Sequence, residues 1–219
     1  MQPAIIVGGQ LVDCDARVVD WTESGLHFEL GRRRHRTSFV VNHWTGSENE
    51  PGAVFVNMTK RRLSVHFIVA PDGTVYQCCD TDMRAAHAVE ANGNALGVGI
   101  EFICRGHDTK VPTKGIVRPQ YVDTVHKRRI VYAGMTPAQV ESAIALNRAL
   151  CVAYDLPTNV PVDARTGGVF GTVLPPQYLA RFRGILGHLH LDADKVDPAL
   201  NLLRALDRAL NAPPPTNVA

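Results

Sequence analysis

The sequence predicts a single α/β domain built on a mixed central β-sheet that is flanked by helices. Short runs rich in β-branched and aromatic residues are interspersed with two segments whose apolar residues recur at helical spacing. The chain has 219 residues, of which 45% are hydrophobic, so it can bury one sizeable core.

Three regions are expected along the chain. Residues 1–36 should form a β-rich lead-in, because they contain short alternating stretches such as residues 17–21. Residues 37–211 should form the main domain. Residues 212–219 contain three consecutive prolines and are expected to be a disordered tail.

Four strands are predicted in the main domain. Residues 38–43 are rich in strand formers, and residues 98–104 are similar. Residues 63–70 and 74–77 flank the turn sequence Pro71-Asp72-Gly73, so they should pair as a β-hairpin.

Two helices are predicted in the second half of the chain. Thr136-Pro137-Ala138-Gln139 has the pattern of a capping box with proline at the first helical position, and this helix should run to about Tyr154. A last helix should begin near Pro198, and its leucines at helical spacing should dock onto the sheet. Residues 105–134 and 157–180 look like long connections.

The charge pattern argues against a nucleic-acid partner. The formal net charge is +2, and the densest basic runs, Arg32-Arg33-Arg34 and Lys127-Arg128-Arg129, are short and far apart. We interpret both as solvated loop charge, because a nucleic-acid binder concentrates basic residues on one face. No apolar run approaches the roughly 20 residues that span a bilayer. The first residues lack the pattern of a secretory signal, so synthesis in the cytoplasm is expected.

The five cysteines have irregular spacing. Without a signal pattern, this odd number indicates free thiols made in a reducing compartment. The adjacent pair Cys78-Cys79 does not have CxxC spacing, so burial as small hydrophobic residues is the better interpretation.

Two segments carry candidate chemistry at strand ends. His43 ends a predicted strand just before a loop, where the backbone is fixed and the side chain stays accessible. In the strand at residues 98–104, alternation places Glu101 on the same face as Gly97 and Gly99. These glycines would leave room for a ligand beside the carboxylate.

A third segment, residues 187–198, offers two histidines and three aspartates. Catalytic zinc takes three protein ligands from His, Asp, Glu or Cys and keeps a fourth position for water. Two ligands from this segment together with His43 would make such a set. Composition alone does not choose among the members of the segment, and the HExxH pattern of helix-borne metalloproteases is absent.

From about Phe39 to Pro198 the sequence resembles the zinc-dependent N-acetylmuramoyl-L-alanine amidases of type 2, whose fold is shared with peptidoglycan recognition proteins and phage lysins. Six motifs match in the same order. They are Val41-Asn42-His43-Trp44-Thr45-Gly46, residues 63–69, Asp72-Gly73-Thr74-Val75-Tyr76-Gln77, Arg84-Ala85-Ala86-His87-Ala88, residues 94–101, and Gly187-His188 with Lys195-Val196-Asp197-Pro198.

The resemblance implies a zinc ion held by His43, His188 and Asp197. Glu101 falls on the catalytic glutamate of the family, and Lys195 falls on the basic residue just before the last ligand. Glu101 would take a proton from water and give it to the departing amine. Lys195 would share the charge of the oxyanion with the zinc ion.

The resemblance also implies a substrate groove that includes Trp44, His87 and Asn94. Some phage members carry a tyrosine where this chain has Val65, so Glu101 would manage the proton alone. His66 matches a recurrent position that is not a ligand, and we expect it to support the sheet or the metal site indirectly.

His190 is the competitor of His188 as the second histidine ligand. The interval from His188 to Asp197 is about one residue shorter than in the commonest members of the family. Strand-like alternation would put both histidines on the same side, and only the preceding Gly187 favours His188.

The function implied by the resemblance is hydrolysis of the bond between N-acetylmuramic acid and L-alanine in peptidoglycan, with one zinc ion in a monomeric chain. A lysin that acts on the cell wall is the expected role, and a cytosolic amidase that recycles anhydro-muropeptides is the alternative. A non-catalytic peptidoglycan-binding protein is disfavoured, because such proteins replace the last ligand with a residue such as serine and this chain keeps Asp197. A structural zinc domain would need a fourth ligand.

Overall fold

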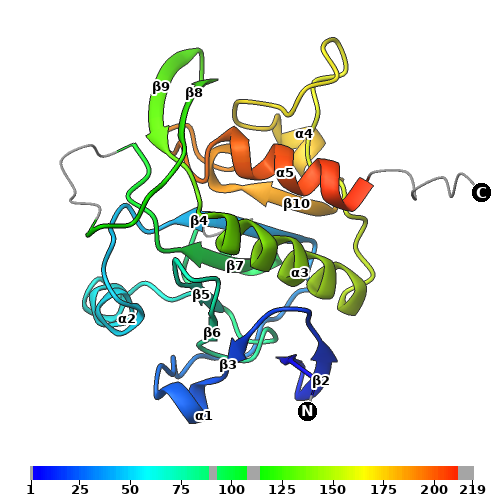
Figure 1. Ribbon diagram of the computed structural model, residues 1–219. Helices are drawn as coiled ribbons and strands as arrows, with labels where there is room; N and C mark the ends of the chain where they lie inside the picture. The colour runs from blue at the N-terminus through cyan, green and yellow to red at the C-terminus, as the bar shows by residue number, and fades with distance from the viewer. Residues whose placement is uncertain (1, 89–92, 108–113, 212–219) are drawn as a thin grey trace, which may run out of the picture.

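The computed structural model describes residues 2–88, 93–107 and 114–211, and a six-stranded mixed sheet lies at its centre (Figure 1). The strand order is β10-β4-β7-β5-β6-β3. In chain order the strands are β3 (Val18–Val19), β4 (Phe39–Trp44), β5 (Phe67–Val69), β6 (Val75–Gln77), β7 (Gly97–Phe102) and β10 (Gly184–Gly187). The predicted mixed sheet is confirmed.

The four strands β10, β4, β7 and β5 are parallel neighbours. β6 joins β5 as an antiparallel hairpin, and β3 from the lead-in runs parallel to β6 at the edge. Ala70 and Thr74 close the predicted turn with a backbone hydrogen bond of 2.9 Å. Because the parallel strands end at the same edge of the sheet, side chains at their carboxyl ends are brought together.

One face of the sheet is covered by α3 (Pro137–Ala153) and α5 (Leu200–Asn211), which lie side by side (Figure 1). The predicted capping box is present: the Thr136 hydroxyl accepts from the Gln139 backbone, and the Gln139 side chain accepts from the Thr136 backbone. Leu146 of α3 and Leu203 of α5 are fully buried against the strands, so the leucine-rich last helix docks onto its own domain as predicted.

The other face carries α2 (Pro51–Lys60) and α4 (Pro176–Leu179). Val54 and Met58 of α2 pack against Ile68 of β5. Leu179 of α4 packs against Phe39 of β4.

Three smaller units complete the fold. β1 (Ala4–Val7) pairs with β2 (Gln10–Asp13), and the short helix α1 (Trp21–Ser24) follows β3 in the lead-in. β8 (Gln120–Val125) and β9 (Arg128–Ala133) form a separate antiparallel hairpin. The predicted tail at residues 212–219 lies outside the described residues.

Several predicted elements are corrected by the structure. The strand expected over residues 63–70 shrinks to β5, because Leu63 and Ser64 lead from α2 into the sheet. The connection at residues 105–134 contains the β8–β9 hairpin. α2 and β10 were not predicted: Gly52 and the valines of α2 disfavour a helix, and β10 is a four-residue strand with glycine at each end.

One residue of the two basic runs was misread. Arg32 and Arg34 are exposed as expected, but Arg33 is partly buried, and its guanidinium donates to the carbonyl oxygens of Gly97, Thr81 and Met83. The other run lies exposed at the turn of the β8–β9 hairpin, as expected. All five cysteines are free and buried, which agrees with the sequence interpretation. In the described part of the chain, no helix combines the length and apolarity needed to cross a membrane.

Candidate metal centre and active site

The candidate residues gather at the carboxyl ends of three neighbouring parallel strands. His43 of β4 pairs directly with Glu101 of β7, so both side chains project from the same face of the sheet. His188 follows the last residue of β10, which lies on the other side of β4. The segment before α5 supplies Asp197, and it is held by a hydrogen bond of 3.0 Å from the Leu189 N–H to the Asp197 carbonyl.

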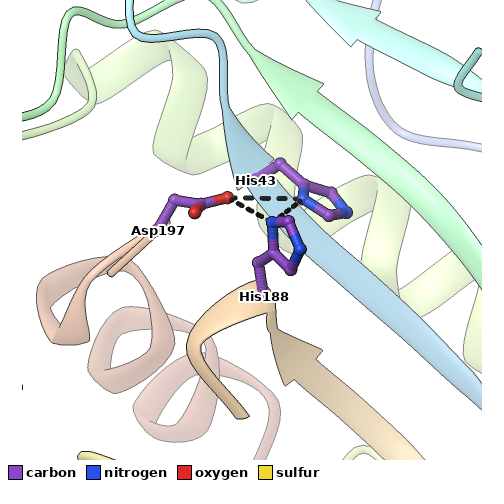
Figure 2. Close-up of side chains that lie close together, drawn as sticks. All are labelled: His43, His188 and Asp197. Carbon is purple, nitrogen blue, oxygen red and sulfur yellow. Dashed lines mark hydrogen bonds and ion pairs between the residues drawn. The ribbon is translucent and has the colours of Figure 1, made fainter. Parts of the chain in front are cut away.

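Three buried side chains from these elements point toward one another (Figure 2). The His43 Nδ1 atom lies 3.1 Å from the His188 Nδ1 atom and 3.3 Å from the Asp197 Oδ2 atom. The His188 Nδ1 atom lies 3.2 Å from the same oxygen. Ligand atoms about 2.0–2.1 Å from a tetrahedral zinc ion are roughly 3.3 Å apart, so the donor set and its spacing fit a three-ligand zinc site.

The electrostatics of this cluster favour a neutral imidazole at His43 and an ionised carboxylate at Asp197, the forms that bind metal. Burial, followed by the neighbouring His188, lowers the pKa of His43 to about 4. Burial alone would raise the pKa of Asp197, but hydrogen bonds to His188 and His43 outweigh it and hold that pKa well below its ordinary value.

Glu101 lines a cleft of about 300 Å³ beside the cluster, together with Trp44 and Lys195. Burial, followed by the charge of Asp197, raises the pKa of Glu101 to about 8, although Arg61 and Lys195 partly offset this. A carboxyl group with a pKa near neutrality can both accept and donate a proton during a reaction. A larger groove of about 1010 Å³ lies elsewhere, around Tyr178, and contains none of the candidate residues.

The structure separates His188 from His190. Residues 188–190 form a 3-10 turn rather than a strand, so the two rings do not share a side as alternation had predicted. The His190 ring is fully buried away from the cluster: its Nδ1 atom accepts from the Gly187 N–H at 3.1 Å, and its Nε2 atom donates to the Phe170 carbonyl at 2.8 Å. Of the two, only His188 belongs to the metal-type cluster.

The space beside Gly99 is filled by protein rather than open to a ligand. A Cβ atom at Gly99 would lie 2.6 Å from Cγ of His87, so the glycine makes room for that imidazole ring. His87 is buried and lines the cleft, and its Nδ1 atom lies 3.0 Å from the His43 Nε2 atom. The expectation that this glycine leaves space for substrate is therefore wrong.

The other predicted residues have varied positions. Trp44 lines the cleft but is mostly buried. Asn94 does not line the cleft: its side-chain oxygen accepts from the backbone N–H groups of His87 and Ala88, at 2.8 and 2.7 Å. His66 lies inside the sheet and accepts from the Gly99 N–H at 2.9 Å, in line with the expected supporting role.

Sequence reasoning missed two cationic or aromatic members of the cleft lining. Arg61 follows the last residue of α2, and His107 lies on the loop after β7. Arg61 is a lone arginine after a helix that was not predicted, so no sequence pattern marked it. The His107 ring lies beside Trp44, with ring centroids 6.0 Å apart.

The fold and the cluster define the class of protein: it is an α/β protein with three side chains that could bind a metal ion at the carboxyl ends of parallel strands. A sequence model of the N-acetylmuramoyl-L-alanine amidase family matches residues 33–199, and the chain belongs to this family. The family match spans all the strands of the site and all three members of the cluster. No curated protein sequence matches the chain significantly.

Solved structures share the fold at low sequence identity. The endolysin amidase LysCS from Clostridium intestinale is 17% identical, with a TM-score of 0.55 over 89% of this chain and 95% of that one. The Ph2119 endolysin from a Thermus scotoductus bacteriophage is 13% identical, with a TM-score of 0.53 over 88% and 97%. AmpD is 20% identical, with a TM-score of 0.52 over 94% and 98%. At these identities the likeness concerns the fold.

Proposed function

We propose that this chain is a monomeric zinc amidase that hydrolyses the bond between N-acetylmuramic acid and L-alanine, and that it degrades cell walls as a lysin. One observation carries this function: His43, His188 and Asp197 converge beside Glu101 in a cleft of a chain that belongs to the amidase family.

His43, His188 and Asp197 would hold the metal. Two imidazoles and one carboxylate are a donor set typical of catalytic zinc, and the three donor atoms lie 3.1–3.3 Å apart. In such a site zinc acts as a Lewis acid and lowers the pKa of a water molecule toward about 7.

Glu101 is the proposed general base and acid. It accepts a proton from the water that attacks the lactyl carbonyl, and it returns this proton to the amine of the departing L-alanine. Pairing of β4 with β7 sets Glu101 next to His43, which supports this role. Lys195 is exposed at the cleft, and its ammonium group would stabilise the oxyanion of the tetrahedral stage.

Two other functions of this fold have weaker support. A non-catalytic binder has no need of a general base, whereas Glu101 lies in the cleft with a pKa raised to about 8. A structural zinc site needs a fourth protein ligand, and among the described residues the cluster has three donors.

Digestion of intact sacculi beside soluble anhydro-muropeptides, followed by mass analysis of both, tests the role. A lysin releases peptides with a new N-terminal L-alanine from the sacculi. Activity confined to the soluble fragments would identify a recycling amidase instead. Failure of the zinc-loaded protein to cleave either substrate would sink the proposed function.

A further inference from the structure

His87 lies next to the candidate metal centre but outside its donor set. The His87 ring approaches His43 edge-on, with ring centroids 5.1 Å apart, and the His87 Nδ1 atom is 3.0 Å from the His43 Nε2 atom. This is the nitrogen of His43 that faces away from Asp197 and His188. Histidine ring nitrogens differ in role, and the partner of one nitrogen decides whether the other can bind a metal.

The hydrogen bonds of His87 fix where its proton lies. The His87 Nε2 atom is 3.4 Å from the carbonyl oxygen of Gly97, which accepts only, so Nε2 carries the hydrogen. The same carbonyl accepts from the Arg33 guanidinium at 2.7 Å, which holds it in place. Among the residues that the structure describes, no carboxylate forms a hydrogen bond with this buried ring, so the neutral form is favoured. The Nδ1 atom of neutral His87 is therefore an acceptor.

An acceptor at this point dictates the tautomer of His43. His43 must donate from Nε2 to fill the 3.0 Å contact, which leaves its Nδ1 atom without a hydrogen. That bare Nδ1 atom is the one that lies 3.1 Å from His188 and 3.3 Å from Asp197. The chain of contacts from Gly97 through His87 thus presents a lone pair toward the centre of the cluster.

The surroundings of His87 keep it in this position. The Asn94 side-chain oxygen accepts from the His87 backbone N–H at 2.8 Å, which anchors the backbone at His87. Gly99 lies against the ring, where a Cβ atom would be 2.6 Å from His87 Cγ. The glycine of the strand and the asparagine before it, both noted in the sequence, are explained by the need to seat one imidazole.

We propose that His87 is a positioning residue that selects the Nε2-protonated tautomer of His43 and orients its Nδ1 atom toward the metal. This inference rests on the proposed zinc function. Partners that orient a metal-bound histidine are typically worth about 10–100-fold in metal affinity. His87 itself neither touches the ion nor transfers a proton in this account.

Zinc affinity measured by competition with a chromophoric chelator tests this role. His87→Phe keeps a ring but removes the acceptor, so the affinity should fall about 10–100-fold. His87→Gln can present an amide oxygen to His43 and should retain affinity within a few-fold of wild type. His27→Phe is the matched control: the same substitution falls on a histidine that stacks on Trp21 in the lead-in and belongs neither to the cleft nor to the metal cluster, so the zinc affinity should be unchanged.

The tautomer can be read directly in the wild-type protein, without any variant. Long-range proton–nitrogen NMR spectra of the metal-free chain should show His43 protonated at Nε2 and bare at Nδ1. A hydrogen on Nδ1, or equal zinc affinity of wild type and His87→Phe, would overturn the positioning role while the proposed amidase stands. Absence of zinc binding by wild type would instead refute the proposed function, and the spectrum would still report the tautomer.

Discussion

Replacement of Glu101 by glutamine should nearly abolish turnover while leaving the metal centre loaded. Glutamine keeps the volume of the side chain but cannot accept a proton. A positioned acid–base group contributes roughly 10²–10⁴-fold, so kcat should fall by about that factor, or roughly 3–5 kcal/mol in activation free energy. Zinc content should stay unchanged, because Glu101 is not in the cluster of donors.

The same substitution should stabilise the metal-free protein. The pKa of Glu101 rises from 4.5 to about 8 on folding, because of burial and then of Asp197. The folded state therefore holds a proton that the unfolded chain has released, and the stability contributed by protonated Glu101 is lost as the pH rises from 4.5 through 8. Between pH 4.5 and pH 7, wild type therefore loses about 3 kcal/mol in free energy of unfolding, at about 1.36 kcal/mol per pH unit.

Glu101→Gln has no carboxyl to ionise, so it should exceed wild type in free energy of unfolding by up to about 3 kcal/mol at pH 7 and by little at pH 4.5. Urea unfolding of chelated protein at several pH values measures this difference. Glu141→Gln on the exposed side of α3 is the control and should change neither kcat nor stability. Wild-type kcat in Glu101→Gln would remove this residue from the mechanism, and a variant that is less stable at pH 7 would contradict the electrostatics.

His188→Ala should lose both zinc and activity. His190→Ala should keep its zinc, as measured by elemental analysis, but have a lower free energy of unfolding, because the buried partners of His190 lose their hydrogen bonds. The reverse pattern would mean that the wrong histidine was assigned. His66 is neutral in the folded state, because burial and then Arg33 lower its pKa from 6.5 to about 3. The stability contributed by neutral His66 is present above pH 6.5 and is lost as the pH falls toward 3. In urea unfolding, the free energy of unfolding of wild type should therefore fall by about 2 kcal/mol more than that of His66→Phe between pH 7 and pH 5. Equal losses in the two proteins would refute this. Arg118→Met should lower the free energy of unfolding by about 3–5 kcal/mol, measured by thermal or urea unfolding, because it leaves the Glu48 carboxylate buried and unpaired. A loss below about 1 kcal/mol would show that water reaches this pair.

The elements that the sequence predicted are those with strong local signals. The capping box at Thr136 and the turn at Pro71-Asp72-Gly73 determine their own geometry, and both form as expected. The strand that carries His43 is a run of residues that favour β-structure. The resemblance to the amidase family singled out three donors from distant segments, which composition alone did not, and the structure brings these three side chains into one cluster.

The features that were missed depend on tertiary contacts. β10 is too short to predict alone and becomes a strand because it pairs with β4 along its whole length. Arg33 looks like surface charge in the sequence, yet its guanidinium is held by three backbone carbonyls from two other segments, Thr81 and Met83 in one and Gly97 in the other. The role of Gly99 is visible only after folding brings His87 against it, because the two residues belong to different segments of the site.

Stoichiometric zinc titration of the metal-free protein tests the central claim most directly. Activity is followed as release of peptides with a new N-terminal L-alanine from a muramyl-peptide substrate, identified by mass. We expect no cleavage before zinc is added, a linear rise in activity with added zinc, and saturation at one ion per chain. The His43→Ala variant should remain inactive at every zinc concentration. Full activity of the metal-free protein, or cleavage at a bond other than that to L-alanine, would contradict the central claim.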